Sequence, residues 1–233
     1  MADRGICSRR EAEQLIEQGM VQVNGKVISK LGVRIDPNQE IKLSPLAIRK
    51  RQALVTILLN KPPGYVSTQP EKNYLDAATL IRKRNLYHPR GEIHRHPPDP
   101  ASLHVAGRLD IDSSGLLVLT QDGSVARRLI HPNHVLEKEY IVRVRGNITD
   151  QSLGFLSEGL ELDGRKLKRA KVCRQTDGQL QLILMEGRKR QIRRMCEQVG
   201  LEVVSLVRVR IGNIQLGRLP RGKWRFLGPN ETF

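Results

Sequence analysis

Short apolar segments of strand length, most of them adjacent along the chain, are the feature that most limits the fold. They include LVTILLN at 54–60, LLVLT at 116–120, the alternating segment 139–145 and LEVVSLVRVRIG at 201–212. Alternation with a period of two is typical of a strand with one buried face. Further strands are expected at 103–106, on both sides of Asp177-Gly178, and at WRFL. Because strands outnumber helices and follow one another directly, we expect an α+β fold with a mixed, mostly antiparallel sheet.

Helices are expected to flank this sheet at 76–84, 124–130, 149–156 and 187–199. The clearest is the last one, in which Ile192, Met195, Cys196 and Val199 recur at the spacing of one helical face. The chain has 233 residues, of which 39% are hydrophobic. That length can bury one sizeable core and carry a small second unit.

The N-terminal region predicts a small unit of its own. Ser8 and Glu11 have the spacing of a capping box before a short amphipathic helix. Asn24-Gly25, between alternating apolar positions, predicts a β-hairpin, and 40–43 predicts another short strand. The unit is too small to have a large core. Because basic residues surround it, we interpret it as an accessory module that binds RNA. The basic residues are Arg9, Arg10, Lys26, Lys30 and Arg34.

These patterns divide the chain into three parts. The accessory module is expected at 1–46, a basic linker at 47–53 and the larger domain at 54–233. The linker is expected from SPLAIRKRQA, which contains proline and three consecutive basic residues. A solvated connector and a segment in direct contact with phosphate are both open readings of it.

The charge balance indicates a polyanionic partner. Forty Lys and Arg residues face 24 Asp and Glu residues, which gives a formal net charge of +16. A chain this basic most often binds nucleic acid, with an anionic membrane as the second candidate. No apolar run approaches the roughly 20 residues that span a bilayer. Aromatic residues make up only 3%, so binding by charge and shape is expected rather than stacking of many bases.

The three cysteines, Cys7, Cys173 and Cys196, are far apart and form no CxxC pair. This usage indicates free thiols in a reducing compartment. The first residues lack the apolar core of a signal peptide. Both features favour a cytoplasmic location.

No metal site is expected from the sequence. His88, His94, His96 and His104 fall in a proline-rich segment and match no metal-ligand spacing. The segment DIDSSG begins like a calcium-binding loop, but Gln121 stands where a bidentate carboxylate would close the site. A solvated loop is the simpler interpretation of the histidine segment.

The stretch GRLDIDSSGLLVLTQDG at 107–123 leaves two readings of Asp110 open. Asp and Ser in such loops commonly bond their own backbone in turns. A carboxylate displayed at a strand end can instead act on a sugar or base. The basic segment EGRKRQIRRM at 186–195 lies at an expected helix start, where phosphate binds well, and one of its arginines could pair with a catalytic carboxylate. Spacing alone does not bring these two segments together.

Three stretches together resemble one family. NKPPGYVST at 60–68, GRLDIDSSGLLVLTQDG and EGRKRQIRRM are similar, in order, to the three motifs of bacterial ribosomal pseudouridine synthases of the RsuA type. EKEY at 137–140 and LVRVRIGNIQLGRLPRG at 206–222 fit later segments of that family. CSRREAEQLIEQGMVQVNGKV resembles the alpha-L RNA-binding module that often precedes the catalytic domain.

The resemblance implies isomerisation of a specific uridine to pseudouridine in ribosomal RNA, by cleavage of the bond between base and ribose, rotation of the base and rejoining through carbon. It implies no metal and no organic cofactor. The expected partner is ribosomal RNA or a ribosomal subunit assembly intermediate, and a monomer is the default state. A flipped nucleotide is expected, because the reacting base lies in structured RNA.

The resemblance also assigns site residues. Asp110 is the expected nucleophile toward the sugar or the base at its neighbouring carbon, and Arg193 the partner that keeps it charged. Tyr140 is expected against the flipped base and Leu206 as an apolar wall under the uracil. Lys61 and Tyr65 are interpreted as scaffold. Contacts to the RNA are expected from Arg108, Arg188, Arg190, Arg194, Arg9, Arg10 and Lys26.

Two departures from the family pattern are visible. The first helix of the N-terminal module is expected to be shortened. The loop 85–104 is longer and richer in His and Pro than the family pattern. Contact of this loop with RNA or with a partner is one interpretation of that difference. A noncatalytic ribosomal RNA-binding or assembly factor remains the main alternative. A nucleoside hydrolase is a weaker one, because it would need neither the charge nor the accessory module.

Overall fold

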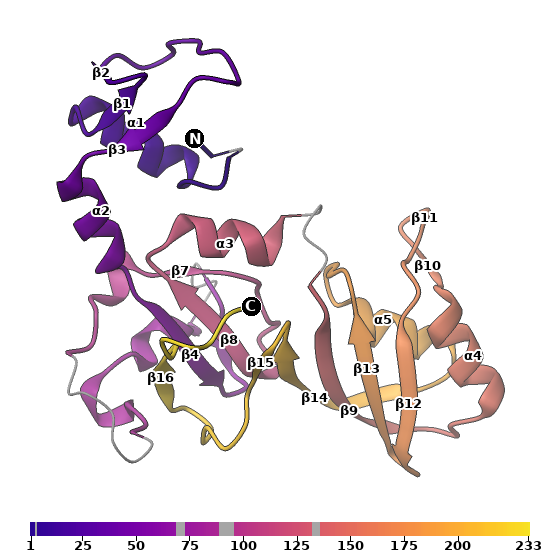
Figure 1. Cartoon of the computed structure of the whole chain (residues 1–233). Helices are drawn as coiled ribbons and strands as arrows, with labels where there is room; N and C mark the ends of the chain where they lie inside the picture. Colours follow the sequence, from indigo (N-terminus) through magenta and orange to yellow (C-terminus); the bar gives the residue numbers. More distant parts are fainter. Residues whose placement is uncertain (3, 69–72, 89–95, 132–135) are drawn as a thin grey trace.

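The computed structural model describes residues 1–2, 4–68, 73–88, 96–131 and 136–233. A small N-terminal module leads through one helix into a larger part built on a nine-stranded sheet (Figure 1). Residues 89–95 of the His/Pro-rich loop 85–104, His94 among them, lie outside the described residues. None of the described helices is long and apolar enough to cross a membrane.

The N-terminal module has the elements that its sequence predicts. Helix α1 (Arg9–Glu17) begins at the Ser8–Glu11 capping box, in which each side chain accepts a hydrogen bond from the other residue's backbone N–H. Strands β1 (Val21–Val23), β2 (Lys26–Ile28) and β3 (Ile41–Leu43) form a sheet in the order β2-β1-β3. The turn between β1 and β2 needs positive φ at both central residues, which Asn24 and Gly25 supply at 47° and 78°.

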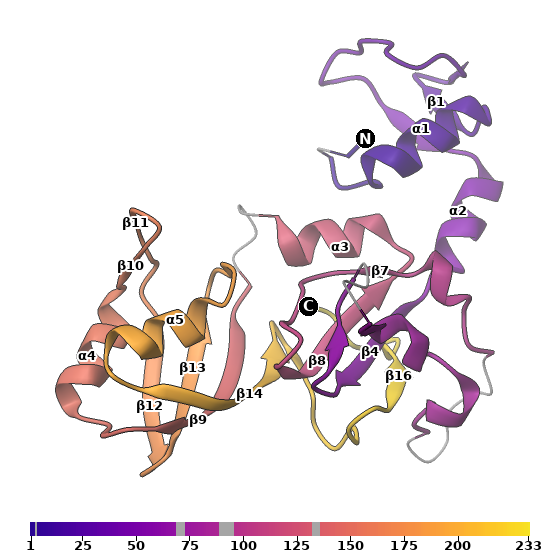
Figure 2. The same ribbon diagram turned by 180° about the vertical axis from the view of Figure 1, so that it is seen from behind.

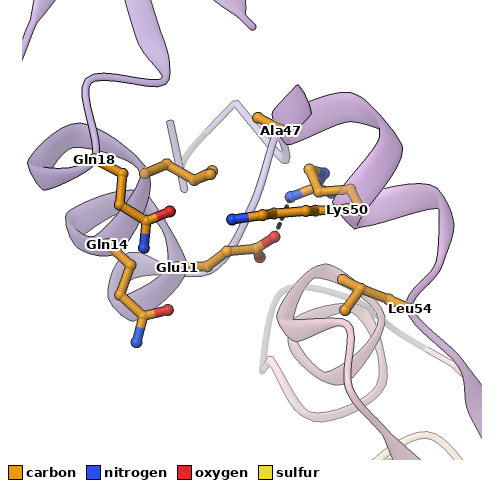
Figure 3. Close-up of a pocket in the computed structure, with 8 residues that line it drawn as sticks. Glu11, Gln14, Gln18, Ala47, Lys50 and Leu54 are labelled. Atoms are coloured by element: carbon orange, nitrogen blue, oxygen red, sulfur yellow. Dashed lines mark hydrogen bonds and ion pairs between the residues drawn. The ribbon is translucent and has the colours of Figure 1, made fainter. Parts of the chain in front are cut away.

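The segment that joins the two parts is helical, which the prediction of a basic connector did not include. Helix α2 (Pro45–Gln52) follows Ser44, whose side chain accepts a hydrogen bond from Ala47 N, and Pro45 occupies the first turn. Both are standard signals for the start of a helix. A pocket of about 190 Å³ lies between α1 and α2, and the Glu11–Arg51 ion pair of 2.8 Å crosses beside it (Figure 3).

The large sheet has the strand order β12-β13-β9-β14-β8-β4-β16, with β7 on β8 and β15 on β14. Of its pairings only β14 with β8 is parallel, which confirms the expected mixed, mostly antiparallel sheet. The strands are β4 (Thr56–Lys61), β7 (His104–Val105), β8 (Ser114–Thr120), β9 (Lys138–Arg145), β12 (Lys171–Thr176), β13 (Gln179–Leu184), β14 (Glu202–Ile211), β15 (Ile214–Gln215) and β16 (Trp224–Phe226).

Three α-helices pack on this sheet: α3 (Gly123–Ile130) on β8, α4 (Asp150–Glu158) on β12 and α5 (Gln191–Gln198) on β14 (Figure 2). Strands β5 (Tyr65–Val66) and β6 (Leu75–Asp76) form one small sheet, and β10 (Glu161–Leu162) and β11 (Arg165–Lys166) form a hairpin.

Three sequence expectations are wrong in detail. The helix expected at 76–84 is two 3-10 turns, Ala77–Leu80 and Lys83–Asn85. Helix α5 begins at Gln191 rather than near 187, because Arg190 has a positive φ of 51°. The third error is the omission of the β10–β11 hairpin: its strands have only two residues each, but the Asp163-Gly164 turn between them, at φ 55° and 68°, is a hairpin signal.

Strand β8 is the centre of the core because all seven of its residues are buried. Leu117 and Leu119 contribute to the larger apolar cluster on one face, and Leu116 and Val118 to a second cluster on the other. A strand covered on both faces reads as a continuous apolar run, as LLVLT does. The loop that enters β8 is therefore anchored at the most buried point of the sheet.

The N-terminal module contacts the start of α3. A side-chain carbon on Gly123 would lie 2.6 Å from Ser8 Oγ, so the two segments meet with no room for a methyl group. Arg127 also donates a hydrogen bond to the carbonyl of Ala2. Figure 1 shows the module above α3 on the side away from α4 and α5.

Candidate active site

Asp110 lies in the loop 107–113, between β7 and β8. The residue before it, Leu109, is buried in the larger apolar cluster. Ser67 Oγ accepts a hydrogen bond from Leu109 N at 2.9 Å and donates one to Leu109 O at 2.6 Å. Side-chain packing and this paired contact together fix the backbone immediately before Asp110.

Every carbonyl from residue 107 to 112 accepts a hydrogen bond. The donors are Arg208 to Gly107 and Arg108, Ser67 to Leu109, Ser113 N to Asp110, Gly64 N and Lys61 to Ile111, and Arg193 to Asp112. They come from β4, the 60–68 turn, α5 and β14. All of them except Ser113, which lies in the loop itself, belong to other elements, and a loop held in this way keeps its side chains in one geometry, as a preorganised site requires.

Two of these donors are fully buried cations, and only one of them had been singled out from the sequence. Arg208 is 1% exposed, and besides Gly107 and Arg108 it donates to Leu116 O at 2.8 Å. Lys61 is 0% exposed and donates to the carbonyls of Pro62 and Tyr65 at 3.0 and 2.8 Å, which agrees with its reading as scaffold. Burial lowers the pKa of Lys61 to about 8, while the Asp112 and Asp110 carboxylates act to raise it.

The place of Arg208 in its strand could not have identified it as a buried residue. In LVRVRIG the apolar–basic alternation is normally read as a buried and a solvated face. The parallel pairing of Arg208 with Gly115 instead turns this side chain toward the loop. Position in the alternation cannot show which basic residue faces inward.

Only glycine fits at position 115 in this arrangement. Its φ is +102°, and a side-chain carbon there would lie 2.7 Å from Arg208 N. β14 therefore passes directly against the end of the loop. This contact explains why the motif returns to glycine before its apolar run.

The Asp110 carboxylate has no hydrogen bond or ion pair to any residue in the described part of the chain. Its backbone carbonyl accepts from Ser113 N at 3.1 Å in a tight turn, so the turn uses the backbone of Asp110 and not its side chain. Of the two readings left open by the sequence, the structure therefore favours a displayed carboxylate over one that bonds its own turn.

In this structure Arg193 contacts Asp112 and not Asp110, the residue with which its pairing was expected. Its Nε lies 3.2 Å from Asp112 Oδ2, and its two terminal nitrogens donate to Asp112 O at 3.3 Å and Val203 O at 3.1 Å. The sequence could not show this, because Asp110 and Asp112 both lie in the loop and spacing does not tell which one faces α5.

Arg190 contacts the same carboxylate, with its NH1 nitrogen 3.1 Å from Asp112 Oδ2. Its backbone is left-handed, at φ 51° and ψ 32°. For a residue other than glycine this conformation costs about 1–2 kcal/mol. Such strain at a candidate site suggests that the position of the side chain matters.

Arg188 and Arg194 are occupied by the β10–β11 hairpin. Arg188 donates to the carbonyls of Leu162, Arg165 and Lys166 at 3.0–3.3 Å. Arg194 forms a bidentate pair with Asp163, at 2.9 and 2.7 Å. Both were expected to contact RNA, and in this structure both hold the hairpin against α5.

Tyr140 and Leu206 lie on one face of the sheet. Tyr140 on β9 is opposite Arg208 on β14, and Val142 is opposite Leu206. Alternate residues of a strand share a face, so Tyr140, Leu206 and Arg208 face the same side. Both apolar side chains belong to the larger cluster and are largely buried.

The other expected RNA contacts are exposed, as their role would require. Arg108 lies in the loop beside Asp110, and Arg9, Arg10 and Lys26 lie on the N-terminal module. Over the described residues, no group of three or more His, Cys, Asp or Glu side chains is placed to hold a metal ion. The three cysteines form no disulfide, and burial raises the pKa of Cys196 to about 12.

Comparison with known proteins agrees with this architecture. The RNA pseudouridylate synthase family matches residues 55–198, and the S4 domain family matches residues 1–41. The dual-specificity RNA pseudouridine synthase RluF of Escherichia coli strain K12 is 36% identical over 233 residues, which cover 99% of this chain and 74% of that protein. Ribosomal large subunit pseudouridine synthase B of Bacillus subtilis strain 168 is 35% identical over 238 residues, covering 100% and 91%.

A solved structure gives the same result in three dimensions. A crystal structure of pseudouridylate synthase has a TM-score of 0.68 at 29% identity and covers 97% of this chain and 93% of its own. Fold and sequence thus define an isomerase that acts on a base of RNA, preceded by a small accessory domain. The chain belongs to the RNA pseudouridylate synthase family and carries an S4 domain at its N-terminus. The resemblance drawn from the sequence motifs is confirmed.

Proposed function

We propose that this chain converts specific uridines of ribosomal RNA to pseudouridine, with Asp110 as the carboxylate that acts on the ribose. The observation that carries the proposal is the contrast at Asp110 itself. Its backbone is fixed on both sides, and its carboxylate is free of partners in the described structure. The substrate class is drawn from the relatives, one of which is named as a ribosomal large subunit enzyme.

The reaction needs a group that assists departure of uracil from the C1′ carbon of the ribose. Asp110 attacks C1′ as a nucleophile, or removes a proton from C2′, while the electron pair of the glycosidic bond leaves with the base. A carboxylate suits this task because C1′ becomes electron-poor, as in glycosidases. The uracil then turns and its C5 bonds to C1′. In the first case this displaces the Asp110 carboxylate from C1′, and in the second case the proton returns to C2′. Loss of the proton from C5 completes the product.

Tyr140 and Leu206 are proposed to form the wall for the flipped base. They share the face of the sheet on which Arg208 holds the loop. Leu206 gives an apolar surface, and the Tyr140 hydroxyl is proposed to help move the C5 proton. Arg193 contributes positive charge to the same site, through its contacts with Asp112.

The RNA is proposed to be held mainly through its phosphates. Arg108 is the exposed cation nearest to Asp110 in the loop, and Arg9, Arg10 and Lys26 extend the basic surface over the S4 domain. Phosphate contacts of this kind offset the cost of extracting a nucleotide from its stack. We place this reaction in the cytoplasm, on ribosomal RNA or a subunit assembly intermediate, with the chain acting as a monomer.

The test is pseudouridine mapping on purified ribosomal RNA of both subunits and on immature subunits. Carbodiimide adducts at pseudouridine stop reverse transcription, so each modified position gives one new stop after incubation with the protein. We expect at least one site-specific stop on one of these substrates. Tight binding to all of them without any stop would favour the noncatalytic RNA-binding or assembly factor instead.

A further inference from the structure

Two basic segments that are distant in the sequence lie together beside β16. Residues 77–88 follow the small β5–β6 sheet, and residues 212–226 end in β16 itself. Three hydrogen bonds join them: Tyr87 N to Trp224 O at 2.7 Å, Lys223 Nζ to Arg84 O at 2.9 Å and Trp224 Nε1 to Arg82 O at 3.0 Å. Both views show the first segment next to β16 (Figures 1 and 2). These contacts fix the two segments to each other.

The two segments contain basic residues but no acidic ones. Neither has Asp or Glu, although the whole chain has 24 of them. One of their cations, Arg225, pairs with Glu231 at 2.5 Å. The other six form no ion pair with any described residue, and all but Lys223 are exposed. We call these six residues the β16 patch: Arg82, Lys83, Arg84, Arg218, Arg221 and Lys223.

The β16 patch lies at the same edge of the sheet as the Asp110 loop. Because β16 runs antiparallel to β4, the segment before β16 meets the end of β4, where Asn60 N donates to Lys223 O at 3.0 Å. The turn that follows β4 contacts the Asp110 loop, since Gly64 N donates to Ile111 O at 2.8 Å. Strands β8, β4 and β16 are neighbours in the sheet, so β16 lies about 10 Å from β8.

The S4 domain meets the sheet at the opposite edge. Helix α2 leads into the start of β4, and the contact of Ser8 with Gly123 follows the end of β8. The seven residues of β8 separate that contact from the Asp110 loop by about 20 Å. The β16 patch therefore supplies positive charge at the edge of the sheet where the S4 domain is not attached.

We propose that the β16 patch binds the phosphate backbone of the RNA next to the flipped uridine. The inference rests on the proposed function, because the RNA that reacts at Asp110 passes this edge of the sheet. Cations of one sign repel one another in the free protein, and a polyanion that covers them relieves this repulsion. Each phosphate that they neutralise also releases counterions, which favours binding. The S4 domain and the β16 patch then hold the RNA at two separate places.

The β16 patch lacks the apolar side chains with which a protein enters a membrane surface. No large apolar side chain is exposed in 77–88 or 212–226, both of which the structure describes in full. Leu219 and Trp224, which lie among the cations in the sequence, are buried. Segments that bind the surface of a bilayer present Trp, Phe or Leu to the lipids. Charge without exposed apolar surface favours RNA as the partner.

The experiment compares two charge-matched variants of the full chain. Arg218→Gln/Arg221→Gln removes two cations from the β16 patch. Arg143→Gln/Arg145→Gln removes two exposed cations from β9, where they lie on the face away from Tyr140. Both variants lower the net charge by the same amount. All four side chains are exposed, so both variants are expected to keep the parent unfolding midpoint.

Binding to purified ribosomal RNA of each subunit is measured over a range of salt concentrations. The β16-patch variant is expected to have a dissociation constant about tenfold above the parent at physiological salt, and a salt slope smaller by about 1.5, because two phosphate contacts are lost. The control is expected to stay within about twofold of the parent, because charges distant from the RNA are screened. The single-turnover rate at saturating RNA is expected to equal the parent rate in both variants.

A second pair of substitutions tests the other segment. Arg82→Gln/Arg84→Gln is expected to weaken binding by about tenfold as well, and the variant with all four substitutions by about 100-fold, because separate phosphate contacts add. Ethylation of phosphates next to the modified uridine is expected to weaken binding of the parent. The same ethylation is expected to have little effect on the variant with four substitutions, which no longer contacts those phosphates.

Three results would overturn the inference. The first is equal weakening by the β16-patch variant and the β9 control, because net charge alone would then explain the loss. The second is parent affinity and parent salt slope in the variant with four substitutions. The third is parent RNA affinity together with lost binding to phosphatidylserine vesicles, which would make the β16 patch a membrane-binding surface.

The proposed function fails by a different result. A parent protein that binds ribosomal RNA but forms no pseudouridine would contradict the reaction at Asp110. The binding titrations would still decide whether the β16 patch contacts RNA, because they do not depend on turnover.

Discussion

At the scale of single residues, the site depends on a close approach between two backbones. Strand β14 passes the end of the Asp110 loop at Gly115, where the backbone has a positive φ and a side-chain carbon would overlap Arg208. The same approach lets the Arg208 guanidinium reach the carbonyls of Gly107 and Arg108. Gly115 and Arg208 therefore act together to set the position of Asp110.

Gly115→Ala is expected to lower the free energy of unfolding by about 3 kcal/mol, from the strained backbone together with overpacking. Gly154→Ala is the matched control. Gly154 lies in the exposed part of α4 with no atom near its absent side chain, so alanine there is expected to stabilise by about 0.5–1 kcal/mol. Urea unfolding of both variants measures the two values. Equal effects of the same sign would contradict the role given to Gly115.

Single residues also show where prediction from sequence ends. The motif placed Asp110 in a loop before a buried strand but left open whether its side chain bonds the turn or is displayed, and the resemblance to a family gave it the displayed role. The partner of Arg193 could not be predicted, since it depends on which of two carboxylates faces α5. Arg208 was missed because a basic residue in an alternating strand is normally solvated.

At the scale of elements, helix starts and tight turns were predictable because their signals are local. The Ser8–Glu11 capping box and the Asn24-Gly25 turn lie where the sequence places them. The hairpin β10–β11 depends instead on long-range contacts with Arg188 and Arg194, at separations of 22 to 31 residues along the chain. Its two-residue strands are too short for a periodic pattern, but the Asp163-Gly164 dipeptide between them, with positive φ at both residues, is a local turn signal that the sequence analysis missed.

The contact between α1 and α3 gives a prediction for the position of the S4 domain. Gly123→Ala is expected to push Ser8 away and loosen the domain, because the new methyl group would overlap Ser8 Oγ. RNA affinity is expected to fall by about tenfold, while the single-turnover rate at saturating RNA stays at the parent value. Binding titrations and single-turnover assays measure the two quantities separately.

A compensating variant makes this prediction specific. Ser8→Gly removes the overlapping atoms and costs only a few tenths of a kcal/mol at a helix N-cap. The double variant Gly123→Ala/Ser8→Gly is therefore expected to regain most of the RNA affinity. If the double variant binds RNA as weakly as Gly123→Ala alone, the contact does not set the position of the domain.

At the scale of the whole molecule, positive charge extends over both parts, whereas the candidate site for the reaction lies in the larger one. The net charge of +16 indicated a polyanionic partner before any fold was known, because charge adds up whatever the fold. Exposed Arg9, Arg10 and Lys26 lie on the S4 domain, whereas Asp110 lies in the loop between β7 and β8 of the large sheet. Helix α2 joins the S4 domain to the larger part. The sequence predicted only a basic connector at this place.

The central claim is that Asp110 carries out the isomerisation, and release of the C5 hydrogen of uridine reports it most directly. RNA containing uridine tritiated at C5 would be incubated with the parent and with Asp110→Asn, after confirming that both bind it equally. The parent is expected to release tritium at the same positions that reverse-transcription stops identify, and Asp110→Asn is expected to release none. Release by Asp110→Asn at the parent rate would contradict the account, because the reaction would then not depend on this carboxylate.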